Sequence, residues 1–491
     1  MAQSYHDGSC MLSPIDQLMP RIYTPIFLVY ETDQYQSAVR KLNEGLAKAT
    51  SILPYLKGSV HKSPDDCHPR NQLSLSWSSS EPPPAIVETS APVSLPSLET
   101  LKRDNAPLSV FQDALSPVPM LINHETPEAK APVIVVGATR LDGGLILCLC
   151  AHHVVMDGAA MGLFLRLWGD CVRDEPNTSF DPREICHRGS WLRDVRDHFA
   201  KTEPKATLEE LLRRHPEYSL RSLSPPPSSM STTASGPPAQ SAAKIFAFSS
   251  AKLEEAKQAM STSIPAKFLT VNNVLGAALW LSITRIRLGR MRRDDLPTMT
   301  DSTPSKLGFA INARSRLGPA VSNKSYLGNL TMLKVVEFPA TKLESVAGNA
   351  MAGPAGADLS LMAPVISAIA AATSIVTATS VGEIVEFSDQ LADVEDVGPG
   401  WNSSHSLDLT YTSWADLGMY DCDFGPVLGG RPQYVRVPYM PFIDGMVLAL
   451  PRRRLANTDG KAVERIEVAI MLNKQDMQAL ENDEILRSWS A

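Results

Sequence analysis

The sequence is poor in features that mark secreted, metal-binding and disulfide-rich proteins. Its 491 residues include seven cysteines, an odd number, and no pair has CxxC spacing. Cys67 and Cys186 each precede a histidine, but the second half of a zinc pattern is missing. The opening residues MAQSYHD contain no basic region followed by an apolar run, so no signal peptide is expected. We therefore expect reduced thiols, no bound metal and a cytoplasmic location.

The motifs of several large enzyme classes are also missing. No GxSxG elbow is present, which argues against a serine hydrolase of the common α/β type. The chain has no GxxxxGK[ST] phosphate loop and no HExxH zinc pattern. Nucleotide hydrolysis through a P-loop and zinc-dependent proteolysis are thereby disfavoured.

The sequence lacks the basic excess that nucleic-acid binding needs. Its net charge is −7, and phosphate contacts require a positive face. Arginines still gather at residues 285–293 and 452–454. Each cluster is typical of a solvated helix end or loop. The alternative is a site for the phosphates of a small anionic cofactor.

One stretch without charge, residues 359–381, is long enough to span a bilayer. It consists mainly of Ala, Ser and Thr and contains Pro364, and such residues insert weakly. We expect no membrane span. The stretch is better interpreted as a buried helical segment, or as one that lines the acceptor side of a substrate site.

The chain divides into two halves of similar length. A Ser/Pro-rich segment at residues 222–243 is too polar to form a core and is expected to be a crossover linker. It separates an N-terminal domain, residues 1–221, from a C-terminal domain, residues 244–491. Both halves mix strand and helix patterns, so the predicted fold class is α/β.

The first half contains a strand that leads directly into two histidines. Residues 133–136 and 145–150 are apolar runs around the turn Asp142-Gly143-Gly144, which predicts a hairpin. The second run is apolar on both faces, so its strand should be deeply buried. Apolar residues then recur with helical spacing after Gly158. His153 therefore lies on a tight connection between a strand and a helix.

His153 is the candidate general base. Imidazole has an ordinary pKa of about 6.5, so it can accept a proton at neutral pH. Asp157 follows four residues later and can either orient the ring or bind an arginine. A lone His-x-x-x-Asp pair is a weak signal. The longer string HHVVMDG at the mouth of a buried strand is far more specific.

This string resembles the HHxxxDG motif of the CoA-dependent acyltransferase superfamily, and within it the BAHD-type plant and fungal transferases. Other segments of that family are matched in the same order. They are LSPID at 12–16, a helix ending in Trp at 272–280, NARSRL at 312–317, YLGN at 326–329, and TSW at 412–414 followed by DFG at 423–425. The resemblance covers nearly the whole chain.

The resemblance implies two similar mixed-sheet domains, as in chloramphenicol acetyltransferase, with a channel between them. An acyl-CoA, with acetyl-CoA as the default, enters from one face and a small-molecule acceptor from the other. His153 takes the proton of the acceptor hydroxyl or amine, which attacks the thioester directly. The implied enzyme is a fungal O-acyltransferase of secondary metabolism. It is expected to be a monomer without a permanently bound cofactor.

The resemblance also assigns roles around the base. Asp157 is expected to shape the site through an arginine, with Arg314 as the preferred partner and Arg316 as the alternative. Arg314, Thr412, Ser413 and Trp414 are expected near the CoA thioester. Thr412, Ser413 or a backbone N–H can supply the oxyanion donor.

A further group has an expected structural role only: His152, Gly158, Asp423, Phe424 and Gly425. The family's DFGWG becomes Asp423-Phe424-Gly425-Pro426-Val427 here, so an indole is lost. We expect residues 428–430 to replace its packing.

Two rival functions stay open. A condensation enzyme of the peptide-synthetase type shares the HHxxxDG motif and uses carrier-bound thioesters. A catalytically silent homologue would act as a binding protein. The identity of the acyl group and of the acceptor cannot be read from the sequence.

Overall fold

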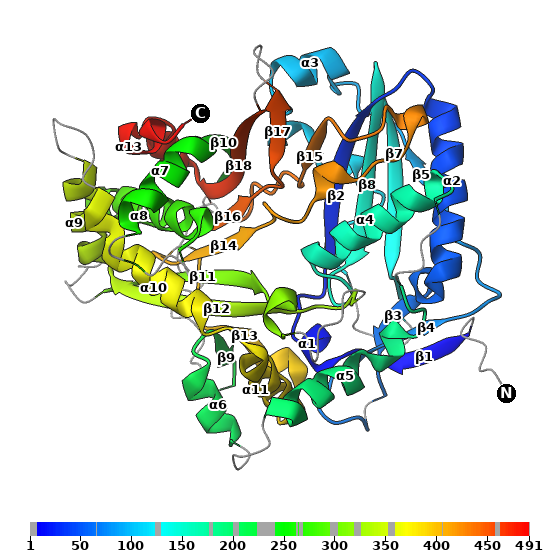
Figure 1. Ribbon diagram of the computed structural model, residues 1–491, viewed down its shortest axis with the longest axis horizontal. Helices are drawn as coiled ribbons and strands as arrows, with labels where there is room; N and C mark the ends of the chain where they lie inside the picture. The colour runs from blue at the N-terminus through cyan, green and yellow to red at the C-terminus, as the bar shows by residue number, and fades with distance from the viewer. Residues whose placement is uncertain are drawn as a thin grey trace.

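Two mixed β-sheets, each covered by helices, form the two halves of the molecule (Figure 1). The computed structural model describes residues 7–64, 66–122, 129–175, 180–199, 206–222, 241–261, 264, 269–294, 303–318, 326–351, 359–404, 406–456 and 462–490. Residues 223–240, most of the predicted linker, lie outside these. Strand β10 begins at Ser241, so the C-terminal half starts slightly before the predicted boundary at residue 244.

The N-terminal sheet contains the strand that ends at the two histidines. Its strands lie in the order β15 (Tyr434–Arg436), β2 (Tyr23–Glu31), β8 (Gly144–His152), β7 (Ile134–Leu141) and β5 (Val87–Thr89). The predicted hairpin is confirmed as β7 and β8, which pair in antiparallel fashion. Gly143 in its turn has a φ of 79°, a conformation that favours glycine. Every residue of β8 is buried, as its apolar pattern predicts.

Helix α4 (Gly158–Val172) carries the chain away from the histidines and packs with α2 (Tyr35–Ile52). The predicted apolar face is confirmed, because Met161, Phe164, Leu165 and Trp168 are all buried. The Trp168 indole Nε1 also donates to the Leu42 carbonyl at 3.0 Å. These contacts hold α4 against α2.

The C-terminal sheet is larger. Its strands follow the order β10 (Ser241–Ser249), β18 (Ala462–Asn473), β16 (Met446–Ala449), β14 (Leu409–Ser413), β11 (Pro304–Asn312) and β12 (Thr331–Pro339), and β17 (Arg453–Ala456) pairs with β18. The covering helices are α7 (Ser250–Met260), α8 (Val271–Arg293), α9 (Ala340–Met351), α10 (Ala363–Ser374), α12 (Lys474–Glu481) and α13 (Glu484–Ser488). Helix α8 begins with a capping box that Thr270 forms with Asn273.

The two halves interlock in space. Strand β15 belongs to the second half of the chain, but it pairs with β2 of the N-terminal sheet. In Figure 1 the orange β15 lies beside the blue β2. Strand β13 (Val397–Pro399) likewise pairs with β9 (Tyr218–Leu220) from the first half. One cluster of buried apolar side chains therefore extends through both halves.

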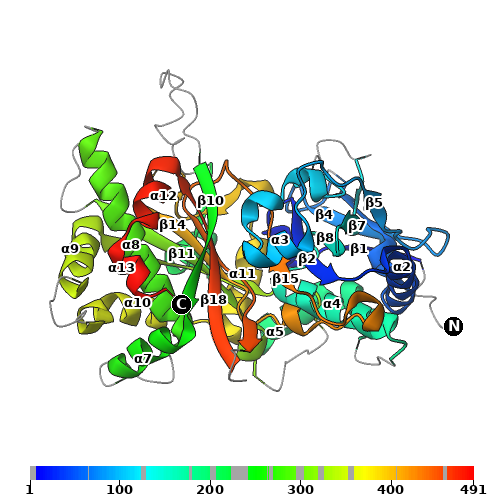
Figure 2. The same ribbon diagram turned by 90° about the horizontal axis from the view of Figure 1, so that it is seen from above.

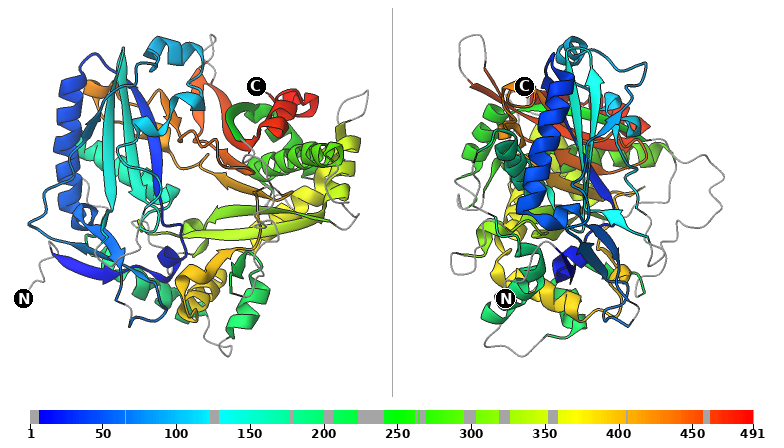
Figure 3. Two further views of the ribbon diagram at one scale, coloured as in Figure 1. Left: turned by 180° about the vertical axis from the view of Figure 1, so that it is seen from behind. Right: turned by 90° about the vertical axis from the view of Figure 1, so that its right-hand side faces the viewer.

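The remaining elements surround these sheets, as Figures 2 and 3 show from above, from behind and from the side. A further sheet has the order β1 (Gly8–Met11), β4 (Leu73–Trp77), β3 (Ser59–Lys62) and β6 (Ala131–Pro132). The other α-helices are α1 (Pro14–Gln17), α3 (Leu98–Arg103), α5 (Glu184–Phe199), α6 (Leu208–Arg214) and α11 (Ala378–Asp389). Short 3-10 helices are η1 (Pro54–Lys57), η2 (Leu108–Val110), η3 (Asp113–Leu115), η5 (Arg314–Arg316), η6 (Leu359–Met362), η7 (Val394–Asp396), η8 (Met419–Asp421) and η9 (Pro426–Leu428).

The uncharged stretch at residues 359–381 is helical but broken into η6, α10 and the start of α11. Met362 and Ile366 are fully buried, which agrees with a buried segment. Within the described residues no single helix is long and apolar enough to cross a membrane; one pair that meets the test by composition is bent by 72°.

Candidate active site

His153 stands in the turn directly after β8, at the wall of a large cavity. Its backbone N–H donates to the Ile22 carbonyl at 2.9 Å, and its own carbonyl accepts from Asn329 Nδ2 at 2.9 Å. The ring borders a cavity of about 810 Å³ between the two halves. Nδ1 is buried, which leaves Nε2 as the nitrogen available to a substrate. Burial lowers the pKa of His153, so the imidazole is neutral near pH 7.

Asp157 binds an arginine and the framework rather than the imidazole. It caps α4 by accepting from the Ala160 N–H at 2.9 Å, and it accepts from the Leu330 N–H at 3.0 Å. Arg314 Nη1 and Nη2 each reach a different carboxylate oxygen at 2.9 Å. Burial alone would raise the pKa of Asp157, but the Arg314 charge and these hydrogen bonds outweigh it and hold the pKa below its usual range. The structure thus places Asp157 in a structural role.

Arg314 has no N–H left for a substrate. Besides Asp157, its donors reach Asn312 Oδ1 at 3.2 Å, the Tyr326 carbonyl at 3.3 Å and the Gly328 carbonyl at 2.5 Å. All five guanidinium N–H groups therefore serve the framework, and Arg314 is not among the residues that line the cavity. Its expected place near the CoA thioester stays a prediction. Arg316, the alternative partner, donates to the Thr373 carbonyl instead.

Strand β14 contributes alternate side chains to the cavity. Thr410, Thr412 and Trp414 line it, whereas Ser413 does not. Side chains of a strand alternate between its two faces, so Ser413 must point away from the face that carries Thr412. This orientation disagrees with the expectation that Ser413 lies near the CoA thioester. Thr412 and Trp414 are placed on the same cavity as His153.

Gly158 is where α4 approaches Trp414. A Cβ atom at Gly158 would lie 3.1 Å from the indole Nε1 and 3.0 Å from Leu417 Cδ1. A side chain would press on the cavity wall, so the motif needs glycine there. His152, the other motif neighbour, is buried at the end of β8 with its ring edge-on to Tyr23.

The other walls of the cavity are mostly apolar, with charge at one end. The apolar lining includes Met19, Leu333 and Trp401, whose indole is anchored by a 2.9 Å hydrogen bond to Thr410. Arg21 Nη1 pairs with Glu395 at 2.6 Å. Sequence reasoning missed these residues because loops bring them together from both halves, and no local pattern marks them. The uncharged stretch at 359–381, which was expected to be buried or to line a substrate site, does not line this cavity.

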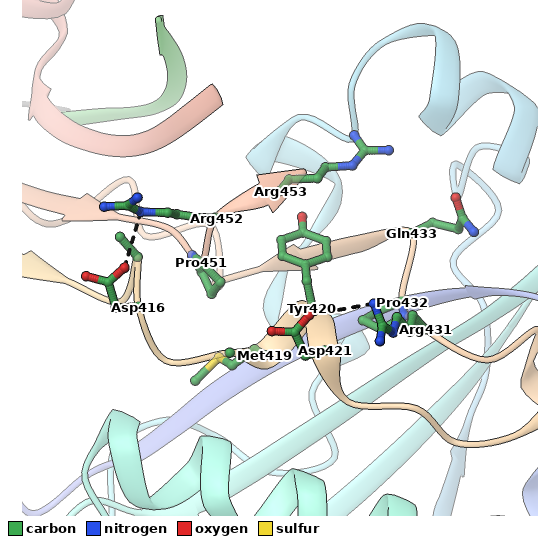
Figure 4. A pocket seen from close by; sticks show the side chains of 12 residues that line it. Asp416, Met419, Tyr420, Asp421, Arg431, Pro432, Gln433, Pro451, Arg452 and Arg453 are labelled. Atoms are coloured by element: carbon green, nitrogen blue, oxygen red, sulfur yellow. Dashed lines mark ion pairs between the residues drawn. The ribbon is translucent and has the colours of Figure 1, made fainter. Parts of the chain in front are cut away.

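A second cavity has a volume of about 430 Å³ (Figure 4). Its lining starts at Ala415, the residue after Trp414, and includes Arg431, Arg452 and Arg453. Arg452 pairs with Asp416 at 3.3 Å, and Arg453 covers the Tyr434 ring at 4.1 Å. The second basic cluster of the sequence therefore borders a cavity.

The first basic cluster is engaged in ion pairs. Arg287 is fully buried and pairs with Asp444 at 2.7 Å. Arg290 pairs with Asp476 at 2.8 Å, and Arg292 with Glu344 at 2.6 Å. The interpretation of residues 285–293 as a solvated helix end holds for exposed Arg292 but is wrong for Arg287, which is buried.

The loop that carries Asp423, Phe424 and Gly425 does not border the large cavity. The Phe424 ring packs edge-on against Trp168 of α4, with ring centres 5.1 Å apart. Gly425 has a φ of 80° and its carbonyl accepts from the Gly430 N–H at 2.9 Å. The loop therefore braces α4 from outside, and buried Leu428 takes part in the same core.

A family model described as the Transferase family matches residues 2–486. The chain belongs to this family. Trichothecene 8-O-acetyltransferase of Fusarium sporotrichioides is 31% identical, over 98% of this chain and 97% of its own length. Fumigaclavine B O-acetyltransferase of Aspergillus fumigatus is 24% identical, over 96% and 94% of the two chains. The resemblance to fungal O-acetyltransferases is confirmed, and this member is an acyl-CoA-dependent O-acyltransferase.

Solved structures agree on the fold. The crystal structure of Fusarium graminearum TRI101 complexed with coenzyme A and deoxynivalenol has a TM-score of 0.76 at 20% identity, covering 98% of this chain and 99% of that one. Vinorine synthase has a TM-score of 0.58 at 17% identity, covering 98% and 94%. The predicted α/β acyltransferase fold with two mixed-sheet halves is confirmed.

Proposed function

We propose that this transferase moves an acetyl group from acetyl-CoA to a hydroxyl of a bulky, largely apolar fungal metabolite, with His153 as general base. One observation carries this proposal. The His153 ring opens on a cavity large enough for a polycyclic acceptor, and an arginine-lined cavity starts at Ala415, next in the chain to Trp414 of the first cavity.

The neutral imidazole is suited to accept the acceptor's hydroxyl proton at Nε2. The freed oxygen attacks the thioester carbonyl carbon and forms a tetrahedral intermediate. The C–S bond then breaks, the ester is released, and the CoA thiolate takes the proton from His153. No acyl-enzyme is needed, because both substrates meet at one base.

Thr412 is the proposed donor to the oxyanion. Its side chain shares the cavity with His153, and its β14 neighbour Ser413 faces the other way. A hydroxyl held by the sheet is preorganised for the charge that develops on the carbonyl oxygen.

The arginine-lined cavity is the proposed entrance for CoA. Arg431, Arg452 and Arg453 outnumber the two aspartates that line the same space, Asp416 and Asp421. Guanidinium groups bind phosphate well through paired hydrogen bonds. The thioester would then reach His153 past Trp414.

The large cavity is the proposed acceptor site. Its apolar walls suit a fused-ring skeleton, and the Arg21–Glu395 pair at one end suits an oxygen substituent. The relative named for 8-O-acetylation of trichothecenes supports an acceptor of this size class.

The test is product analysis by mass spectrometry. The purified enzyme is incubated with deuterated acetyl-CoA and a panel containing a trichothecene with a free 8-hydroxyl, fumigaclavine B and a small alcohol. We expect a deuterated acetyl ester on a polycyclic acceptor and equal release of CoA. Transfer only from a carrier-bound thioester would favour the condensation enzyme. No transfer at all would favour a silent homologue.

A monomeric state and a cytoplasmic location stay predictions. Light scattering after gel filtration tests the first, and the fluorescence of a tagged chain tests the second.

A further inference from the structure

The turn that carries His153 is held from behind by two buried polar side chains. Asn329 Nδ2 donates to the His153 carbonyl at 2.9 Å. Arg188 Nη1 donates to the Val155 carbonyl at 2.7 Å. Both carbonyls lie in the turn between β8 and α4, so these bonds fix its path.

Asp16 joins the two side chains. Its Oδ1 accepts from both the backbone N–H and the Nδ2 of Asn329, each at 2.8 Å. Its Oδ2 lies 3.7 Å from Arg188 Nη1 and accepts from the Ser13 N–H at 3.2 Å. Asp16, Arg188 and Asn329 are 0%, 1% and 0% exposed. A buried charge is retained only when it is paired and hydrogen-bonded, and here the bonds converge on the turn with the base.

Asn329 also acts on the imidazole of His153. Its side-chain oxygen Oδ1 and His153 Nδ1 are both buried, and neither atom has a hydrogen-bond partner among the described residues. An interaction between the two side chains favours the protonated ring, partly offsetting the effect of burial. When Nε2 takes a proton, the ring needs an acceptor at Nδ1–H, and the backbone carbonyl of His153, which Asn329 holds, favours the protonated ring.

We propose that Asn329 is a positioning residue for the base, that it fixes the backbone that carries the imidazole, and that Asp16, paired with Arg188, fixes Asn329. This inference rests on the proposed function, in which His153 is the base. It is separate from the Asp157–Arg314 pair, which anchors the far end of the same turn and binds the residues after Asn329.

The experiment compares Asn329→Ala with Asn273→Ala. Asn273 is an equally buried asparagine that caps α8 and does not contact the turn. For Asn329→Ala we expect kcat to fall by about 10- to 100-fold while both KM values stay within about twofold. Because the contact raises the pKa of His153, its loss should also move the acid limb of kcat/KM to lower pH.

Each possible outcome either supports or overturns the proposed role of Asn329. A lower kcat with a shifted acid limb in Asn329→Ala, and neither change in Asn273→Ala, supports the proposal. If Asn329→Ala gives no folded protein, Asp16→Asn replaces it, and the same two changes are expected. Equal pH profiles for wild type and variant, after correction for the folded fraction, overturn the proposal. If His153→Ala is also fully active, the proposed function fails as well; if His153→Ala is inactive, only the role of Asn329 is lost.

Discussion

Arg314 donates two hydrogen bonds of 2.9 Å to the two carboxylate oxygens of Asp157, and this ion pair links the C-terminal half to the histidine motif. Asp157 is 2% exposed and Arg314 14% in their side chains, so water screens the pair little. Removing one partner of such a pair leaves an uncompensated charge inside the protein.

We expect Asp157→Asn to lower the free energy of unfolding by about 3 kcal/mol. Because the pKa of Asp157 is lowered by folding, its contribution is present above its unfolded pKa of about 3.9 and disappears as the pH falls through the folded value. Denaturant unfolding at neutral pH measures the loss. The control is Asp181→Asn, which breaks an exposed pair with Arg183 and should cost no more than about 0.5 kcal/mol. Equal losses in the two variants would contradict the role given to Asp157.

The pH dependence of kcat/KM should show that the general base, His153, has a lowered pKa. Burial disfavours the imidazolium form of His153, so kcat/KM should stay level through neutral pH and decline only below about pH 6.5. Steady-state rates with a fixed acceptor, from about pH 5 to about pH 9, test this. An acid limb centred above pH 7 would show that the base is stabilised in its charged form.

Thr412 and Ser413 offer a matched pair on one strand. We expect Thr412→Val to reduce kcat by about 100-fold, because the variant keeps the shape but loses the oxyanion donor. Ser413→Ala should leave kcat within about twofold, since its side chain points away from the cavity. Similar losses in both variants would remove Thr412 from the mechanism.

The arginine-lined cavity predicts a change in KM for one substrate only. Arg453→Gln should raise the KM for acetyl-CoA by about tenfold and leave the acceptor KM unchanged, because a phosphate contact acts on binding. Arg292→Gln is the control from the first basic cluster, where Arg292 pairs with Glu344. A higher acceptor KM in Arg453→Gln would place the acceptor, rather than CoA, in this cavity.

The secondary structure around His153 was largely predictable from short stretches of sequence. Continuous apolarity marked β8 as buried, the Asp-Gly-Gly turn marked its hairpin, and the helical spacing after Gly158 marked α4. Such features depend on residues close together in the chain, so the sequence carries them directly.

Long-range pairing was not predictable in the same way. The strand pattern around Val435 gives no sign that β15 joins the sheet of the other half. The family resemblance names Arg314 as the partner of Asp157, but it does not show the bonds from Arg314 to Asn312 and to the carbonyls of Tyr326 and Gly328. The same limit applies to the large cavity, whose wall combines Arg21 with Glu395 from distant parts of the chain.

The replacement of His153 by alanine tests the central claim most directly. A single-turnover assay with saturating acetyl-CoA and an accepted metabolite measures the chemical step. Loss of the general base should slow that step by about 10²- to 10⁴-fold, with an unchanged thermal midpoint and unchanged binding of CoA. A folded His153→Ala variant that acetylates at the wild-type rate would contradict the account.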